Sequence, residues 1–107
     1  MAAEHKATDL RRLPAQVLSP GVSRRLFEGD DAILILYEFA ADAEAPVHEH
    51  GWEHLGYALR GQITIGLPDH TVTVSAGDVY HIPANLPHSG RAGPEGAALL
   101  ESRARPR

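Results

Sequence analysis

The sequence predicts an all-β domain, an antiparallel jelly-roll barrel, and three observations support this. Short runs rich in Val, Ile, Leu and Tyr recur along the chain, separated by Gly, Pro, Asp and Asn at intervals typical of a β-sandwich or barrel. No segment shows a 3.6-residue apolar period sustained over the length of a helix. The 107 residues suit one domain with one core. We therefore expect residues 13–107 to form a double-stranded β-helix and residues 1–12 to form an N-terminal tail.

The apolar runs predict eight strands, which are Val22–Glu28, Ala32–Ala40, Val47–His50, Leu55–Arg60, Gln62–Leu67, Thr71–Ser75, Asp78–Ile82 and Gly96–Glu101. Three segments have the composition of tight connections: Gly29-Asp30-Asp31, Arg60-Gly61-Gln62 and Leu67-Pro68-Asp69-His70. Such connections favour antiparallel neighbours, and a double-sheet jelly roll is one way in which antiparallel strands limit exposed edges.

Composition argues against several classes of function. The net charge is −4 and the basic residues are scattered, which disfavours a nucleic-acid partner. There is no cysteine, so disulfides, thiolate metal ligands and a cysteine nucleophile are excluded. The longest apolar run, Ala32 to Tyr37, is too short to cross a bilayer, and the N-terminus has no apolar signal-peptide core. We expect a cytoplasmic protein without a membrane partner.

Four histidines in two stretches predict a site for one divalent transition metal. They are His48, His50, His54 and His88. Alternate side chains of a strand share a face, so His48 and His50 would point the same way. The segment Gly51-Trp52-Glu53 can then bend and bring His54 back toward them. Imidazole ligands leave the identity of the metal open among Zn, Ni, Fe, Mn and Cu.

The surroundings of the remaining candidates are less specific. Two prolines flank Asn85, a residue that tolerates a left-handed backbone, and this predicts a rigid turn before His88. His5 in the tail and His70 in a turn are expected to have no role in the site. The pattern does not decide which face His81 takes. Trp52 suits either stacking on a flat substrate, or packing or a dimer contact.

The two histidine stretches resemble the paired motifs of the cupin superfamily. The first motif has H-x-H, then usually Glu, then Gly, and the second has Gly, Pro, Gly or Asn, and His. The matching residues are His48, His50 and Gly61 in the first motif, and Gly77, Pro83, Asn85 and His88 in the second. The resemblance extends from about Val22 to Glu101, and it implies a jelly-roll barrel that binds one divalent metal.

The sequence departs from this pattern at His54, which stands where the family usually has Glu. Glu53 lies one residue earlier, and strand alternation allows only one of the two to face inward. The spacing to Gly61 selects His54. A site of four histidines would leave the charge of the metal uncompensated and make it a stronger Lewis acid. It would also lack the glutamate that acts as a base in some cupin oxygenases.

Among small cupins, the chain is similar to single-domain proteins of pectin and alginate breakdown, which convert a 4,5-unsaturated uronate to its keto form. The similarity is carried by the segments GVSRRLFEGDDAILILYEF, VHEHGWEHLGYALRG and GDVYHIPANLPHS. It implies that Glu101 and Arg107 take the positions of a catalytic acid and an arginine, whereas Arg103 stands where that group has Phe.

Three functions are compatible with these observations. The first is a metal-dependent isomerase or lyase for a small anionic metabolite such as an unsaturated sugar acid, with Glu101 as proton carrier and Arg107 or Arg91 as anion partner. The second is a metal-dependent dioxygenase. The third is a non-catalytic module that binds a ligand or a metal. We also expect a homodimer, because a barrel this small leaves the apolar strand face of Leu55, Tyr57 and Leu59 to cover.

Overall fold

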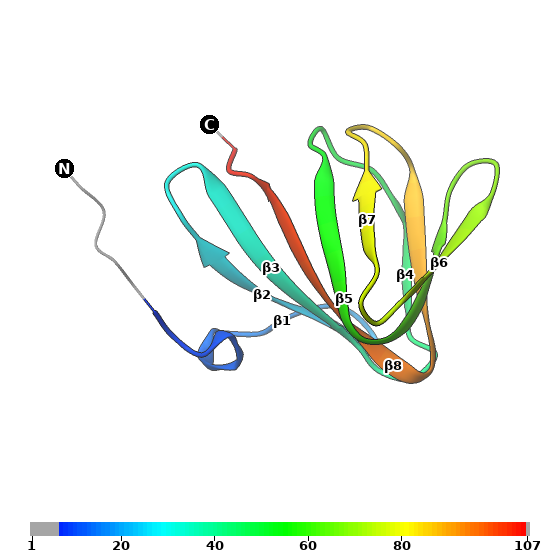
Figure 1. Cartoon of the computed structure of the whole chain (residues 1–107), viewed down its shortest axis with the longest axis horizontal. Helices are drawn as coiled ribbons and strands as arrows, with labels where there is room; N and C mark the ends of the chain where they lie inside the picture. Colours follow the sequence, from blue (N-terminus) through cyan, green and yellow to red (C-terminus); the bar gives the residue numbers. More distant parts are fainter. Residues whose placement is uncertain (1–6, 107) are drawn as a thin grey trace.

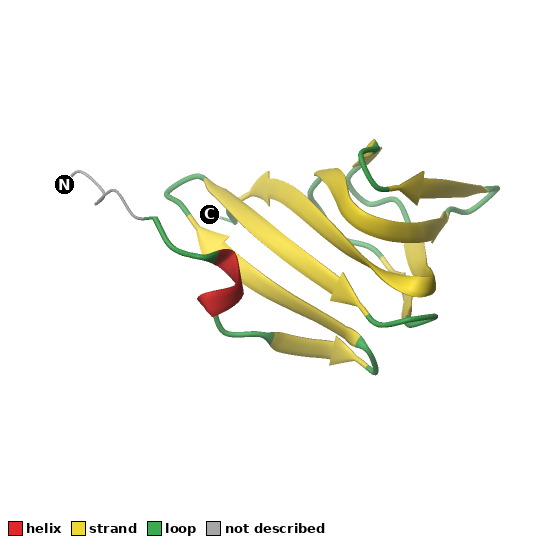
Figure 2. Cartoon of the chain, turned by 60° about the horizontal axis from the view of Figure 1, so that its bottom comes forward, coloured by secondary structure: helices red, strands yellow, loops and turns green. Residues whose placement is uncertain are grey.

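The structure, a computed structural model, describes residues 7–106 and is built almost entirely of β-strands (Figures 1 and 2). Its elements, in order, are η1 (Leu10–Arg12, a 3-10 helix), β1 (Gln16–Ser19), β2 (Val22–Glu28), β3 (Ala32–Phe39), β4 (Glu44–His48), β5 (His54–Gly66), β6 (Thr71–Ser75), β7 (Val79–Ile82) and β8 (His88–Ala104). Within residues 7–106 there is no helix that is long and apolar enough to cross a membrane.

All strand pairs are antiparallel, and two long strands hold the barrel together. The first part of β8 pairs with β4 and with the second part of β5. The remainder of β8 pairs with β3 and with the first part of β5. One curved layer therefore has the order β1-β2-β3-β8-β5-β7, and the other has β4-β8-β5-β6. This arrangement is the predicted jelly roll.

The long strands bend where glycines allow the two backbones to approach each other. The pairing of β5 with β8 shifts register around Gly61, which has a φ of 71°. A Cβ atom at Gly61 would lie 2.0 Å from the carbonyl oxygen of Gly96, whose own φ is 77°. The prediction of a turn at Arg60-Gly61-Gln62 was wrong, because Gly61 bends a continuous strand instead of ending it.

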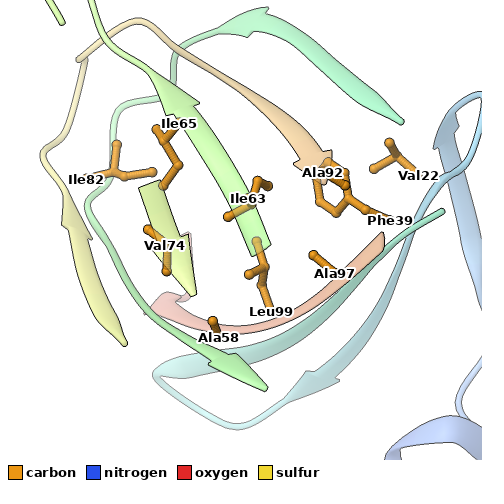
Figure 3. Packing of buried hydrophobic residues seen from close by; sticks show 10 residues of the cluster. All are labelled: Val22, Phe39, Ala58, Ile63, Ile65, Val74, Ile82, Ala92, Ala97 and Leu99. Atoms are coloured by element: carbon orange, nitrogen blue, oxygen red, sulfur yellow. The ribbon is translucent and has the colours of Figure 1, made fainter. Parts of the chain in front are cut away.

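The core lies between the two layers, where side chains from all around the barrel meet (Figure 3). In the first part of β5 the inward residues His54, Gly56 and Ala58 are buried, and the residues between them are exposed. The buried apolar cluster consists of Val22, Phe39, Ala58, Ile63, Ile65, Val74, Ile82, Ala92, Ala97 and Leu99. Strand alternation thus places the histidine side of β5 and this core in the same interior.

Most predicted strands are confirmed, and besides the continuous β5 there are three differences. The strand predicted at Val47–His50 runs from Glu44 to His48, so His50 lies in the loop that follows it. The strand predicted at Gly96–Glu101 is only part of β8, and β1 was not predicted. The predicted turn at Leu67-Pro68-Asp69-His70 is confirmed, with the Leu67 N–H donating to the His70 carbonyl at 2.8 Å.

Candidate metal centre

The histidines predicted to bind metal lie at one end of the barrel, where three strands begin or end. His48 is the last residue of β4, and it is paired in register with His88, the first residue of β8. His54 is the first residue of β5, and His50 lies in the loop between. The turn that precedes β8 is tied to this loop, because the Asn85 N–H donates to the His50 carbonyl at 2.7 Å.

The predicted rigid turn owes its shape to a left-handed residue. Asn85 has a φ of 63°, a conformation that Asn tolerates better than most residues. The turn therefore brings His88 beside the histidines of the first stretch, although the two stretches are far apart in the sequence.

Three of the four imidazoles converge closely enough to share one ion. Within residues 7–106, the group of potential ligands that meets this condition is His48, His50 and His88, whose ligand nitrogens all lie within 4.8 Å of one another. The ring centroids of His48 and His88 are 4.2 Å apart, and that of His50 lies 5.0 and 5.1 Å from them. Nitrogen donors in this arrangement fit a divalent transition metal.

The backbone determines which nitrogen His48 and His88 present. The Nδ1–H of His48 donates to the Pro46 carbonyl at 2.8 Å, and the Nδ1–H of His88 donates to the Leu86 carbonyl at 2.8 Å. A carbonyl oxygen can only accept, so each Nδ1 carries the hydrogen. Each Nε2 then keeps its lone pair, which is the state needed for a metal ligand.

His54 lies next to the group of three but is not part of it. Its Nε2 is 2.9 Å from His50 Nδ1, and its ring centroid is 4.4 Å from that of His50. Its Nδ1 lies 2.7 Å from Glu101 Oε1, although the contact is not aligned as a hydrogen bond. The side chain is buried, whereas Glu53 is exposed. The expected inward orientation of His54 is therefore observed, and its role as a fourth ligand stays a prediction.

Glu101 is a buried carboxylate held from two sides. Its Oε1 faces His54 Nδ1, and its Oε2 accepts a hydrogen bond from Tyr80 Oη at 2.5 Å. Only 7% of the residue is exposed, so Glu101 is not a solvent-exposed residue at the end of a strand. Burial and the adjacent Glu101 charge raise the pKa of Tyr80, so its phenol keeps the proton that it donates.

Tyr80 occupies this position because the opposing residue is glycine. Gly56 on β5 pairs with Tyr80 on β7, and a Cβ atom at Gly56 would lie 2.1 Å from Tyr80 Cζ. Sequence reasoning missed Tyr80. The alternation Tyr80, His81, Ile82 was the signal available, since it places Tyr80 on the same face as the apolar Ile82 and His81 on the other.

The electrostatics of the cluster favour neutral imidazoles. Burial, followed by the neighbouring His54, His48 and His88, lowers the pKa of His50 to about 4. Burial also lowers the pKa of His88, with His48 and His54 contributing. Neutral imidazole is the form that donates a lone pair to a metal. His50 and His88 are therefore in the metal-binding protonation state at neutral pH.

Trp52 packs at the edge of the site. Its ring stacks on His50 with centroids 4.8 Å apart and planes 5° from parallel, and the guanidinium of Arg103 lies 4.2 Å from the centre of the Trp52 ring. Arg103, which stands where the resemblance led us to expect Phe, therefore contacts Trp52. Of the two interpretations of Trp52, the contacts are those of a packing residue that restrains His50.

Several predicted residues lie elsewhere or outside the described chain. His81 and Glu53 face outward and pair with each other at 2.9 Å, and His70 bonds Asp69 in an exposed turn. Arg91 pairs with Glu44 at 3.5 Å on the surface and does not line the cavity, so the structure gives it no place in the site. His5 and Arg107 lie outside the described residues.

The histidines and Glu101 open onto one interior cavity of about 330 Å³. This is at the lower end of the range of about 300–1,000 Å³ that is typical of small-molecule sites. The four imidazoles and the Glu101 carboxylate line this cavity together, and much of the remaining lining consists of core side chains.

Fold and site together define a class: a small antiparallel β-barrel that carries a cluster of histidines suited to a divalent metal in its interior. The chain belongs to the cupin family, because the family model described as "Cupin domain" matches residues 35–101, more than half of its length. No curated protein matches the sequence significantly.

Solved structures with the same fold include several that cover almost the whole chain. KdgF from Halomonas sp. is 19% identical, with a TM-score of 0.84, and the match covers 97% of this chain and 96% of that one. A RmlC-like cupin from Shewanella frigidimarina is 20% identical, with a TM-score of 0.83 and coverage of 98% and 94%. The polyketide cyclase RemF from Streptomyces resistomycificus is 27% identical, with a TM-score of 0.83 and coverage of 94% and 80%.

Proposed function

We propose that this cupin is a metal-dependent enzyme that moves a proton within an enolisable carbonyl compound, in a reaction of the isomerase or lyase type. The observation that carries the proposal is the position of Glu101. Its buried carboxylate faces the same small cavity as the converging imidazoles. Such a reaction needs an acid–base group beside a bound metal, in a cavity that limits the access of water. Glu101 and the histidines provide these groups.

The metal would be held by His48, His50 and His88, and we propose His54 as the fourth ligand. A divalent ion there would supply positive charge to stabilise the negative charge that develops on a substrate oxygen. Glu101 lies against the Nδ1 side of His54. A carboxylate behind a metal-ligating histidine commonly fixes the orientation of that ring.

The proton transfer would be carried out by the Glu101 carboxylate. It would accept a proton from the carbon next to the carbonyl group and return it to another atom of the same substrate, so that a double bond moves and no proton is gained or lost overall. The hydrogen bond from Tyr80 Oη would hold the carboxylate in place during both steps. The apolar walls would keep water from competing for the proton.

The comparison with RemF is in keeping with this chemistry, since that protein is named as a polyketide cyclase.

The first test is elemental analysis of untagged protein never exposed to a metal column, beside the His48→Ala/His88→Ala double variant. We expect near-stoichiometric metal in the parent and little in the variant. A parent that is empty and takes up no added divalent ion would overturn the proposal in favour of a non-catalytic binding module.

The second test addresses the reaction. The metal-loaded protein is incubated in D₂O with a 4,5-unsaturated uronate and, separately, with benzoylacetone, and deuterium incorporation is followed by NMR while an electrode records O₂. Incorporation faster than in a protein-free sample, without O₂ consumption and reduced to the protein-free rate in Glu101→Gln, supports proton transfer. O₂ consumption that stops under anaerobic conditions would contradict it and identify a dioxygenase.

A further inference from the structure

The interior cavity has a strongly asymmetric lining. Its histidines, Glu101 and Tyr80 lie together, because His54 contacts both His50 and Glu101 and Tyr80 donates to Glu101. The wall beyond them is formed largely by buried apolar side chains, which are Val22, Phe39, Ile63, Ile65, Ile82 and Leu99. Figure 3 shows these side chains pointing into the barrel from strands on opposite sides. A molecule in this cavity would meet nitrogen and oxygen at the histidine end and mainly hydrocarbon over the rest of its surface.

The other polar side chains of the lining are few, namely Ser19, Arg24, Tyr37 and Ser89. Ser19 Oγ already donates to the Glu44 carbonyl at 3.1 Å, and Arg24 Nε donates to Gln16 Oε1 at 2.9 Å. Between these residues the wall is hydrocarbon, which offers no partner to most of the hydroxyl groups of a sugar acid. A buried polar group without a partner is strongly disfavoured, so these hydroxyls would oppose binding.

Aromatic surface adds to the apolar character of the lining. Phe39, Tyr37 and Tyr80 all line the cavity, and aromatic faces and edges pack well against flat rings. The volume of about 330 Å³ suits a compact ligand rather than an extended one.

From this lining we infer that the protein takes a compact, largely apolar ring compound with oxygen donors along one edge, such as a hydroxyaryl ketone, rather than a sugar acid. The oxygen edge would lie at the histidine end, and the rings would lie against Phe39, Ile63 and Ile65. This inference rests on the proposed function for the role of the histidine end. Recognition of the apolar part depends on the wall alone, and it can therefore be tested without metal.

The experiment is isothermal titration calorimetry on chelator-treated, metal-free protein with two probes, 2-acetyl-1-naphthol and D-galacturonate. We expect the naphthol to bind at least tenfold more tightly than galacturonate. Ile65→Thr, which replaces hydrocarbon in the wall, should weaken naphthol binding several-fold. Leu18→Ser, at the exposed rim of the same cavity, should weaken it without endangering the fold. Val17→Ser, on β1 beside Leu18 but exposed and outside the lining, is the matched control and should bind as the parent does.

Galacturonate binding as tight as naphthol binding would overturn the inference. So would naphthol binding that is unchanged in both Ile65→Thr and Leu18→Ser, with folding checked by thermal unfolding. The proposed function fails by a different result, namely absence of metal uptake or of deuterium incorporation. The two failures are therefore distinguishable.

Discussion

Each imidazole of the site has two ring nitrogens, and for His48 and His88 the local backbone selects the one that is free to bind a metal. In both His48 and His88 the ring bonds the carbonyl two residues earlier in the chain, from Pro46 and Leu86 respectively. The same short-range contact thus prepares a ligand in each of the two histidine stretches. Because it needs no distant residue, it holds these two rings ready before a metal arrives.

The fourth ligand is tested by comparing adjacent residues. We expect His54→Ala to lower metal occupancy much as His50→Ala does, because the inward ring at position 54 contacts His50. Glu53→Ala should leave occupancy unchanged, since that side chain pairs with His81 on the outer face. Metal content after dialysis against a competing chelator gives the answer. Loss of metal in Glu53→Ala and not in His54→Ala would reverse the assignment.

Glu101 and Tyr80 are tested by separating chemistry from metal binding. Glu101→Gln should keep the shape of the side chain and reduce kcat by about 10²–10⁴-fold, the usual contribution of general acid–base catalysis. Tyr80→Phe removes only the hydroxyl that donates to Glu101 and should have a smaller effect on kcat. Metal content should stay near that of the parent in both. If Glu101→Gln loses metal in proportion to activity, its carboxylate orients His54 and carries no proton.

For single residues, the spacing of His48, His50 and His88 in the sequence predicted a metal site. The resemblance to small cupins indicated Glu101. Tyr80 could not be found in the same way. Its position depends on pairing with Gly56 across two strands, and on the space that a missing side chain leaves there. Register of this kind results from the closed barrel and is not a local property of either segment.

At the scale of elements, β5 and β8 decide the shape of the barrel, because each belongs to both layers. Their bend requires two backbones to pass at Gly61 and Gly96, closer than any side chain allows. The sequence pattern predicted the strand segments on either side of Gly61, but it also predicted a turn at the glycine. A glycine in the left-handed conformation is compatible with both a turn and a bulge, and only the partner strand distinguishes them.

Gly61→Ala should therefore destabilise the protein through two effects. The added methyl group would meet the Gly96 carbonyl at 2.0 Å, and a left-handed φ of 71° disfavours any residue with a Cβ. We expect the free energy of unfolding to fall by about 3 kcal/mol. Gly77→Ala is the control: it has a φ of 94° but no atom within 4 Å of the added Cβ. Its loss should be about 1–2 kcal/mol, from the backbone alone. Equal losses in urea unfolding would contradict the role given to the close approach.

At the scale of the whole molecule, one outer face of the barrel remains apolar. Leu55 and Tyr57 on β5 are 57% and 43% exposed, and Val79 on β7, paired with Tyr57, is 77% exposed. Apolar residues gathered on an exposed sheet face commonly mark an interface. The homodimer expected from the sequence is therefore retained as a proposal for this face, in which two copies would pair through the same patch.

The dimer proposal is tested by sedimentation velocity. We expect the parent to sediment as a dimer and the Leu55→Glu/Tyr57→Lys variant to sediment as a monomer, because the charges would be buried in the interface. Val72→Glu, an exposed apolar residue on β6, is the control and should remain dimeric. A parent that is monomeric at all concentrations, or a variant that stays dimeric, would rule out this face.

The histidine cluster also has a consequence for chain connectivity. His48, His50 and His88 come from segments that are distant in the sequence and neighbours only in the folded barrel. An ion shared by these side chains would act as a cross-link, closing a long loop and adding its binding free energy to the stability of the native state. Protein without the ion would stay folded but with a smaller free energy of unfolding, so that a shortage of metal would leave it more exposed to proteolysis as well as inactive.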